Sequence, residues 1–227
     1  MRASLLALLF TIAAGLLPGL PARAQTPESP AQIIANIINR DMSLVSYEAH
    51  VDIRLHTGIP LLNPTLEGVT YFKRPDHYEV VFTKVPSYAK GFEKLYTDIG
   101  DPAQWDKRYR ISVVGETPYN GHKDIVLNLV ERVQGMIDHE EVLVDAQHWV
   151  VDAMTYHYYN GGFITLEQAF RNEGGFNVLS EQHATIALAH LPRATGNAHY
   201  SAYRFNVAID DAVFTEHETK NMGVGGK

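Results

Sequence analysis

Histidines and carboxylates are the residues of this 227-residue chain whose types could support catalysis or metal binding. The 11 histidines are scattered, and three of them, His139, His148 and His157, follow one another at intervals of nine residues. Histidine pairs that share a zinc ion usually lie about three to five residues apart. The chain also has no cysteine, which excludes thiolate metal sites and cysteine nucleophiles. We therefore expect no metal ion and no cofactor.

Paired carboxylates occur at Glu140-Glu141 and at Asp210-Asp211. Adjacent residues of a strand point to opposite faces, so neither pair places two carboxylates together for acid and base catalysis. The sequence lacks Gly-x-Ser-x-Gly, His-Glu-x-x-His and a phosphate-binding Gly-rich loop before a helix. An enzyme is therefore the least favoured class, and we assign no catalytic residues.

The first 24 residues have the features of a secretory signal peptide. Arg2 precedes an apolar stretch, and the sequence Ala22-Arg23-Ala24 is typical of a cleavage site. The apolar stretch is too short to span a bilayer comfortably. We expect cleavage after Ala24, export, and one mature domain from residue 25 to 227. The chain carries a formal net charge of −7, which disfavours nucleic acid and anionic membranes as partners.

A helix is predicted to begin at Pro30, after Ser29 as N-cap, and to run to about residue 41. A second helix is predicted within residues 87–100, and a helical turn within residues 101–105, which end at Trp105. Both helices carry an apolar stripe that must be buried. The first stripe consists of Ile33, Ile34, Ile37 and Ile38, and the second of Phe92, Leu95, Tyr96 and Ile99.

The clearest strand covers residues 45–55, where apolar and polar residues alternate. Tyr47, Val51 and Ile53 belong to the apolar set, and His50 and Asp52 to the polar set. This pattern predicts an antiparallel strand with one buried and one wet face. Ten further strands are predicted, many of them joined by tight turns. They cover residues 65–73, 77–84, 108–115, 122–132, 140–144, 149–159, 163–171, 176–179, 181–190 and 198–209.

The sequence therefore predicts a mainly β (α+β) fold. A twisted antiparallel sheet of about eleven strands tends to curl or to close. Because the two helical stripes also need a partner, we expect a curled sheet or incomplete β-barrel with the helices laid as a lid over its concave face. Whether that interior is solid or contains an apolar cavity is left open by the pattern.

The segment from Gly68 to Pro75, Gly-Val-Thr-Tyr-Phe-Lys-Arg-Pro, resembles a motif of the LolA family, the periplasmic carriers of outer-membrane lipoproteins. The order of signal peptide, helix and first long strand is similar too. The resemblance implies an incomplete antiparallel barrel with a helical lid. It also implies that Arg74 contacts and latches the lid, and that Tyr78 lines the cavity. A guanidinium can hold several free carbonyls at a helix end, so this role is chemically reasonable.

The resemblance implies a soluble periplasmic carrier for the acyl chains of a lipoprotein or lipid. Such a carrier would be a monomer that takes cargo from an inner-membrane exporter and passes it to an outer-membrane acceptor. The family usually has a Ser-Asp-Gly turn after the motif strand, where this chain has residues 87–100, so the cargo is open. The alternative is an envelope-stress sensor or lipid-responsive interaction domain of the same fold. The candidate cavity or lid residues are Ile33, Ile37, Tyr47, Val51, Phe72, Arg74, Tyr78, Phe92, Tyr96 and Trp105.

Overall fold

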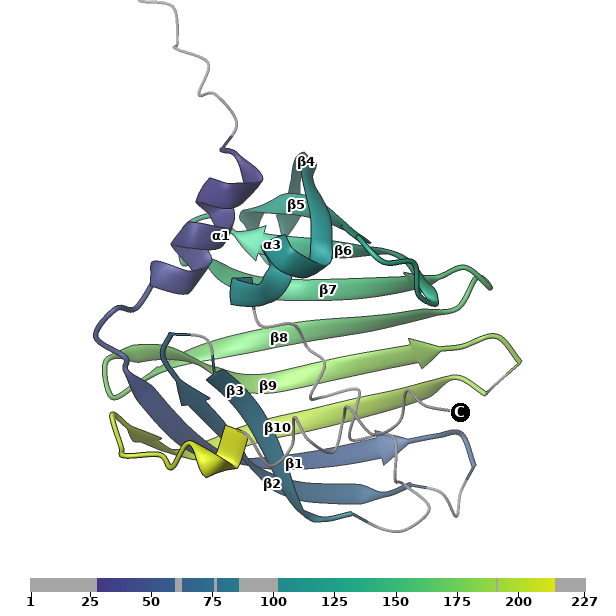
Figure 1. The fold of residues 1–227 in the computed structure, drawn as a ribbon. Coiled ribbons are helices and arrows are strands. Elements are labelled where there is room, and N and C mark those ends of the chain that lie inside the picture. The colour runs from purple at the N-terminus through teal and green to yellow at the C-terminus, as the bar shows by residue number, and fades with distance from the viewer. Residues whose placement is uncertain (1–27, 60–62, 76, 86–101, 191, 215–227) are drawn as a thin grey trace, which may run out of the picture.

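The computed structural model describes residues 28–59, 63–75, 77–85, 102–190 and 192–214. Within these ranges the chain forms one ten-stranded antiparallel sheet with short helices beside it (Figure 1). The strands are β1 (Ser46–His56), β2 (Thr65–Lys73), β3 (His77–Lys84), β4 (Tyr109–Tyr119), β5 (His122–Glu131), β6 (Ile137–Asp145), β7 (Val150–Tyr158), β8 (Phe163–Glu173), β9 (Phe176–Ala187) and β10 (Ala194–Phe205). The helical elements are α1 (Pro30–Asn39), the 3-10 turn η2 (Pro102–Gln104) and α3 (Trp105–Arg108).

The sheet is curled and open. Its strand order is β3-β2-β1-β10-β9-β8-β7-β6-β5-β4, so the last strand pairs with the first, and β3 and β4 form the two free edges. In Figure 1 the edge strands turn toward the same side, where α1 and α3 lie in front of the upper strands. This arrangement confirms the mainly β class and the incomplete barrel.

The number of strands differs from the expected eleven. Residues 176–179 and 181–190 belong to one strand, β9, which pairs with β8 and β10. In its pairing with β8 the register shifts between Ala169 and Phe170, where Ser180 is an extra residue of β9. This irregularity interrupts the alternation of side chains without ending the strand, which explains why the pattern suggested a break. The last strand also ends at Phe205, four residues earlier than expected.

Strand β1 follows the expected alternation along most of its length. Ala49, Val51 and Ile53 are buried, whereas His50 and Asp52 are partly exposed. The pattern fails at the start of the strand, where Val45 is exposed and Ser46 is buried. The Ser46 hydroxyl donates a 2.6 Å hydrogen bond to the carbonyl of Val207, which makes its burial favourable.

Helix α1 begins as expected, since the Ser29 hydroxyl accepts a 3.2 Å hydrogen bond from the amide of Gln32. The helix ends at Asn39, slightly before the expected residue 41. Its buried isoleucines pack with Trp105 and with side chains of β4–β7 in the main core. The expected second helix, including Phe92, Leu95, Tyr96 and Ile99, lies outside the described residues.

Candidate functional site

A cavity of about 230 Å³ lies beneath the C-terminal end of α1. Its walls come from α1 and the loop that follows it, from β1–β3, from η2 and α3, and from β7–β10. Most lining side chains are aliphatic or aromatic, as in typical sites for apolar ligands. They include Ile37, Ile38, Leu44, Tyr47, Phe72, Tyr78, Trp105, Val151, Met154, Phe170, Val178, Leu179 and Tyr200.

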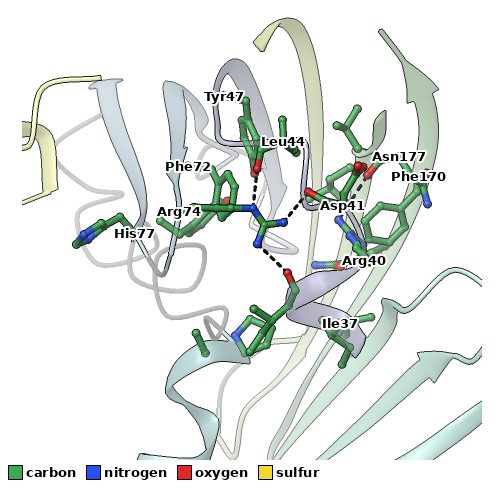
Figure 2. A pocket seen from close by; sticks show the side chains of 18 of the residues that line it. Ile37, Arg40, Asp41, Leu44, Tyr47, Phe72, Arg74, His77, Phe170 and Asn177 are labelled. Carbon is green, nitrogen blue, oxygen red and sulfur yellow. Dashed lines mark hydrogen bonds between the residues drawn. The ribbon is translucent and has the colours of Figure 1, made fainter. Parts of the chain in front are cut away.

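Arg74 closes the end of α1 at the cavity wall (Figure 2). Its Nη1 donates to the carbonyl of Ile38 at 3.0 Å, its Nη2 to that of Asp41 at 2.6 Å, and its Nε to that of Leu44 at 2.7 Å. The last turn of a helix leaves carbonyls without intrahelical partners, and one guanidinium satisfies three carbonyls here. Arg74 therefore fixes both the helix end and the loop leading into β1.

The neighbours of Arg74 in the 68–75 segment hold it in place. Gly68 is needed by packing, since a Cβ there would lie 2.9 Å from the carbonyl oxygen of Val81 on β3. Lys73 donates to the carbonyl of Ile209 at 3.2 Å and forms an ion pair with Asp211. Gly68 thus packs against β3, Lys73 contacts the chain after β10, and Arg74 contacts α1. Each of these three residues has a structural role.

The β1–β2 side of the cavity is lined by aromatic rings that pack against one another. Tyr47 stacks on Phe72 with ring centroids 5.3 Å apart and contacts Tyr203 edge-on at 5.4 Å. Burial is the main cause that raises the pKa of the Tyr47 and Tyr78 hydroxyls above the usual value. Both tyrosines are therefore neutral at physiological pH, and this wall presents apolar rings rather than charge.

Arg40 also lines the cavity and lies beside Phe170 and Asn177 (Figure 2). Its guanidinium carbon is 5.4 Å from the centroid of the Phe170 ring, and Nη2 donates to the carbonyl of Asn177 at 3.4 Å. These contacts tie the residue after α1 to β8 and β9. This side of the cavity therefore carries an exposed arginine, whereas most of the lining is apolar.

Two polar side chains of the cavity wall are buried without complete hydrogen bonding. In the described part of the chain, the indole Nε1 of Trp105 and the amide Nε2 of Gln182 have no hydrogen-bond partner. Trp105 is 1% exposed and Gln182 is 2% exposed. Both atoms are donors, and a ligand with a hydrogen-bond acceptor would satisfy them once the two side chains turn toward the cavity.

The structure places six of the residues singled out in the sequence around the cavity, namely Ile37, Tyr47, Phe72, Arg74, Tyr78 and Trp105. Ile33 and Val51 do not line it, because both are buried in the cores on either side. Phe92 and Tyr96 lie outside the described residues. Ligand contact stays a prediction for all ten.

The sequence reasoning missed the wall formed by β7–β9, including Met154, Phe170 and Gln182. Alternation within these strands shows that such residues share a face. It does not show which strands lie opposite α1, because that depends on sheet order and curvature. Phe170 and Gln182 had no local signal that distinguished them from other residues of the same face.

Comparison with solved structures shows that the chain has a LolA-like fold. It is similar to a DUF1329 family protein from Desulfovibrio piger, with a TM-score of 0.64 and 11% identity over 83% of this chain and 97% of that one. An outer-membrane lipoprotein-sorting protein domain from Vibrio parahaemolyticus gives a TM-score of 0.59 and 13% identity over 83% and 97%. A LolA superfamily protein from Nitrosomonas europaea gives 0.60 and 12% over 84% and 99%.

These identities are low, so the likeness shows the fold and does not show what the chain binds. No protein-family model matches the sequence. No curated protein matches it either. Within the described residues, no helix is long and apolar enough to cross a membrane.

Proposed function

We propose that this protein is a periplasmic carrier that holds acyl chains of a lipoprotein or lipid in the cavity beneath α1. The observation that carries the proposal is an apolar cavity beneath a helix whose C-terminal end is held by three hydrogen bonds from Arg74. Comparable solved folds include one described as a lipoprotein-sorting domain, which supports the same class of cargo. The signal-peptide features of residues 1–24 support export, with cleavage after Ala24.

The energetics of the cavity suit an acyl chain. Each methylene removed from water contributes about 0.8 kcal/mol, so ten buried methylenes contribute about 8 kcal/mol before the costs of association. The two guanidinium groups of the lining do not require an acidic ligand, since Arg40 is exposed and Arg74 already donates to three backbone carbonyls. Apolar length, rather than charge, would therefore set the affinity.

The two unsatisfied donors refine the expected cargo. Trp105 Nε1 and Gln182 Nε2 would donate to the carbonyl oxygen of an acyl ester or amide whose chain fills the rest of the cavity. A plain hydrocarbon would leave both donors buried and unsatisfied. We therefore propose that cargo is an acylated molecule, bound through its chain and positioned through its carbonyl.

Cargo release would follow from the way α1 is held. Three hydrogen bonds from Arg74 fix the C-terminal end of the helix, and the nearby Ile37 and Ile38 both line the cavity. A change that withdraws Arg74 would free this end and open the cavity wall. An inner-membrane exporter that loads the carrier and an outer-membrane acceptor that unloads it would act on this element.

The test is displacement of a fluorescent apolar probe by an acylated peptide from the purified mature protein. Val151, a half-buried cavity residue, is replaced by phenylalanine to fill the space. The matched control is Val69→Phe, because Val69 is also a half-buried strand valine but does not line the cavity. We expect the wild type and the control to bind the probe, and Val151→Phe to bind it at least tenfold more weakly.

Gln182→Met provides a second variant that keeps the side-chain volume and removes the donor. It should weaken binding of an acyl ester about fivefold while leaving an alkane-based probe unaffected. A folded wild type that binds neither probe nor acylated peptide would refute the carrier and favour an interaction domain. Equal binding by Val151→Phe would place the ligand elsewhere on the protein.

A further inference from the structure

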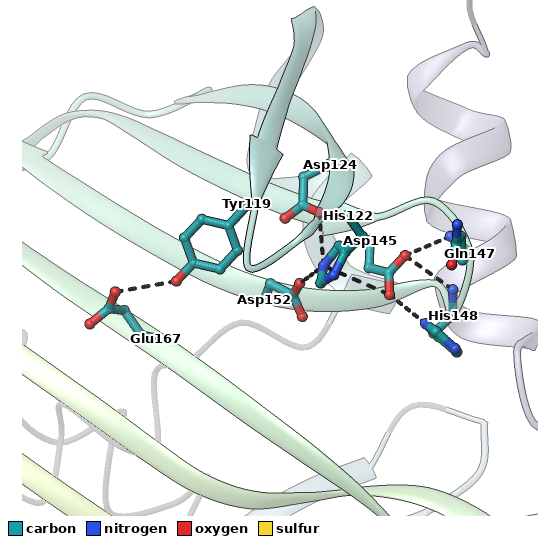
Figure 3. Close-up of polar contacts among 8 residues, drawn as sticks. All are labelled: Tyr119, His122, Asp124, Asp145, Gln147, His148, Asp152 and Glu167. Carbon is teal, nitrogen blue, oxygen red and sulfur yellow. Dashed lines mark hydrogen bonds and ion pairs between the residues drawn. The ribbon is translucent and has the colours of Figure 1, made fainter.

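A cluster of polar residues lies at one end of three neighbouring strands, at the start of β5, the end of β6 and the start of β7 (Figure 3). None of its residues lines the cavity. The imidazole of His122 lies among three aspartates there. Its Nε2 is 2.6 Å from Oδ2 of Asp152, 3.2 Å from Oδ1 of Asp124 and 4.0 Å from Oδ2 of Asp145. All three aspartates are buried, and Asp124 is 0% exposed. Such a density of buried carboxylates is costly without a compensating cation.

The strand geometry explains how these residues meet. Asp124 and Asp145 are directly opposite each other in the pairing of β5 with β6. The next pair, Ile125 and Val144, faces α1 in the main core, so the two aspartates point to the opposite face of the sheet. A register shift in the pairing of β6 with β7 leaves Asp152 without a partner residue. This bulge turns a third carboxylate toward the same centre.

The hydrogen bonds in the cluster leave one carboxylate unsatisfied. His122 Nε2 can donate one proton, and its shortest contact is with Asp152. Asp145 accepts from the Gln147 amide at 2.6 Å and lies 2.5 Å from Nδ1 of His148, so the turn after β6 satisfies it. In the described part of the chain, neither oxygen of Asp124 has a hydrogen-bond partner. Asp124 is therefore a fully buried acceptor aimed at the centre of the cluster.

The distances suit a divalent cation. One ligand atom from each of His122, Asp124 and Asp152 lies within 4.8 Å of the other two. In a tetrahedral zinc site with bonds of about 2.0–2.2 Å, neighbouring ligand atoms lie about 3.3 Å apart. The 3.2 Å contact between His122 and Asp124 is close to that spacing, whereas the 2.6 Å contact between His122 and Asp152 is shorter and would lengthen when the ion binds. One imidazole nitrogen with carboxylate oxygens is a donor set for a borderline ion such as Zn²⁺ rather than for Ca²⁺ or Mg²⁺.

We propose that His122, Asp124 and Asp152 form a Zn²⁺-binding site, with Asp145 as the neighbouring carboxylate that positions His148 at its rim. The site would join the start of β5 to the bulge of β7. It would also hold the tip of the β4–β5 hairpin, whose Tyr119 hydroxyl already donates to Glu167 of β8 at 3.2 Å. This site is independent of the proposed cavity, because none of its three ligands lines the cavity.

The proposal is tested by calorimetric titration of the chelator-treated mature protein with ZnCl₂, MnCl₂ and CaCl₂, and by thermal unfolding with and without ZnCl₂. We expect one Zn²⁺ per chain, an affinity at least tenfold higher for Zn²⁺ than for Ca²⁺, and a rise in Tm of a few degrees. Asp124→Asn and His122→Gln should each reduce Zn²⁺ affinity at least tenfold and remove the rise in Tm.

The matched control is Asp52→Asn. Asp52 also lies beside a histidine, His50, at 3.4 Å, but both residues are substantially exposed on β1. We expect this variant to bind Zn²⁺ like the wild type. The proposal is overturned if the wild type shows no stoichiometric Zn²⁺ binding. It is equally overturned if the folded Asp124→Asn and His122→Gln variants both bind as the wild type does, which would indicate exposed histidines as the source.

Discussion

The two faces of β5, β6 and β7 differ in the side chains that they bury. On the face toward α1, Leu127, Val142 and Val144 are completely buried and form the main core. On the other face, Asp124 and Asp145 are buried too, but as carboxylates beside His122. The alternation of strand side chains lets one element carry an apolar wall and an ionic cluster at the same time.

The two regions also differ in how they satisfy charge. Arg74 donates three short hydrogen bonds to backbone carbonyls at and after the end of α1. Asp124 is more deeply buried and has no hydrogen-bond partner in the described structure. Arg74 therefore has a structural role in the protein as it stands, whereas Asp124 would gain partners only from the proposed Zn²⁺ ion. In the absence of a metal ion, variants of the two regions should therefore differ in the size of their effect on stability.

The largest effect is expected for Arg74→Leu, which leaves three carbonyls without donors. We expect the free energy of unfolding to fall by about 3 kcal/mol while the protein stays folded, because the lost hydrogen bonds are charge-assisted. Cargo should also dissociate faster. Chemical denaturation and probe release measure the two effects. Arg204→Leu is the control, since Arg204 is an exposed side chain that forms an ion pair with Glu48, and its loss should cost less than about 1 kcal/mol. Unchanged cargo retention in Arg74→Leu would contradict the latch.

A smaller effect is expected at Glu140, which is buried on the α1 side of β6 near Tyr109, Arg108 and Glu131. Burial is the main cause that raises its pKa from 4.5 to about 7. Between these values the folded state binds more protons than the unfolded state, so stability falls as the pH rises from 4.5 to 7 and stays reduced above it.

Replacing Glu140 with glutamine should flatten this pH dependence and increase stability at pH 8 by about 2 kcal/mol, since no charge needs burial. Denaturation curves from pH 4 to 9 measure it. The exposed neighbour Glu141 provides the control Glu141→Gln, which should follow the wild-type curve. A Glu140→Gln variant that keeps the wild-type slope would show that Glu140 does not carry the effect.

The smallest effect on stability is expected for Asp124→Asn in the absence of metal. The change removes one of three neighbouring carboxylates and breaks no hydrogen bond of Asp124. We expect the free energy of unfolding to change by less than about 1 kcal/mol. Chemical denaturation in the presence of a chelator provides the measurement. If Asp124→Asn lowered the free energy of unfolding as much as Arg74→Leu, Asp124 would have a structural role of the same size, which would contradict this account.

Much of the region around α1, β1 and Arg74 could be predicted from the sequence, because its elements are recognised from neighbouring residues. Ser29 and Pro30 marked the start of α1, and alternation identified the buried face of β1 from Ala49 onward. The position of Arg74 near the helix end came from the resemblance of its motif, and the structure shows the contacts. The bounds of β2 and β3 also agree with the expected residues.

The second region could not be predicted, because its residues meet through tertiary geometry. The search for metal ligands considered the spacing between histidines, whereas the cluster contains one histidine with aspartates from three strands. Asp152 reaches the centre through a bulge, and a bulge has no reliable sequence signal. The same limit applies to Phe170 and Gln182 in the cavity, which depend on the order of the strands.

Mass spectrometry of the native protein purified from a periplasmic extract tests the central claim most directly. The carrier account predicts one acylated molecule retained per chain by the wild type and by Val69→Phe, and loss of that molecule from Val151→Phe. A folded wild-type protein that carries no acylated molecule, and that takes none up when it is added, would contradict the account.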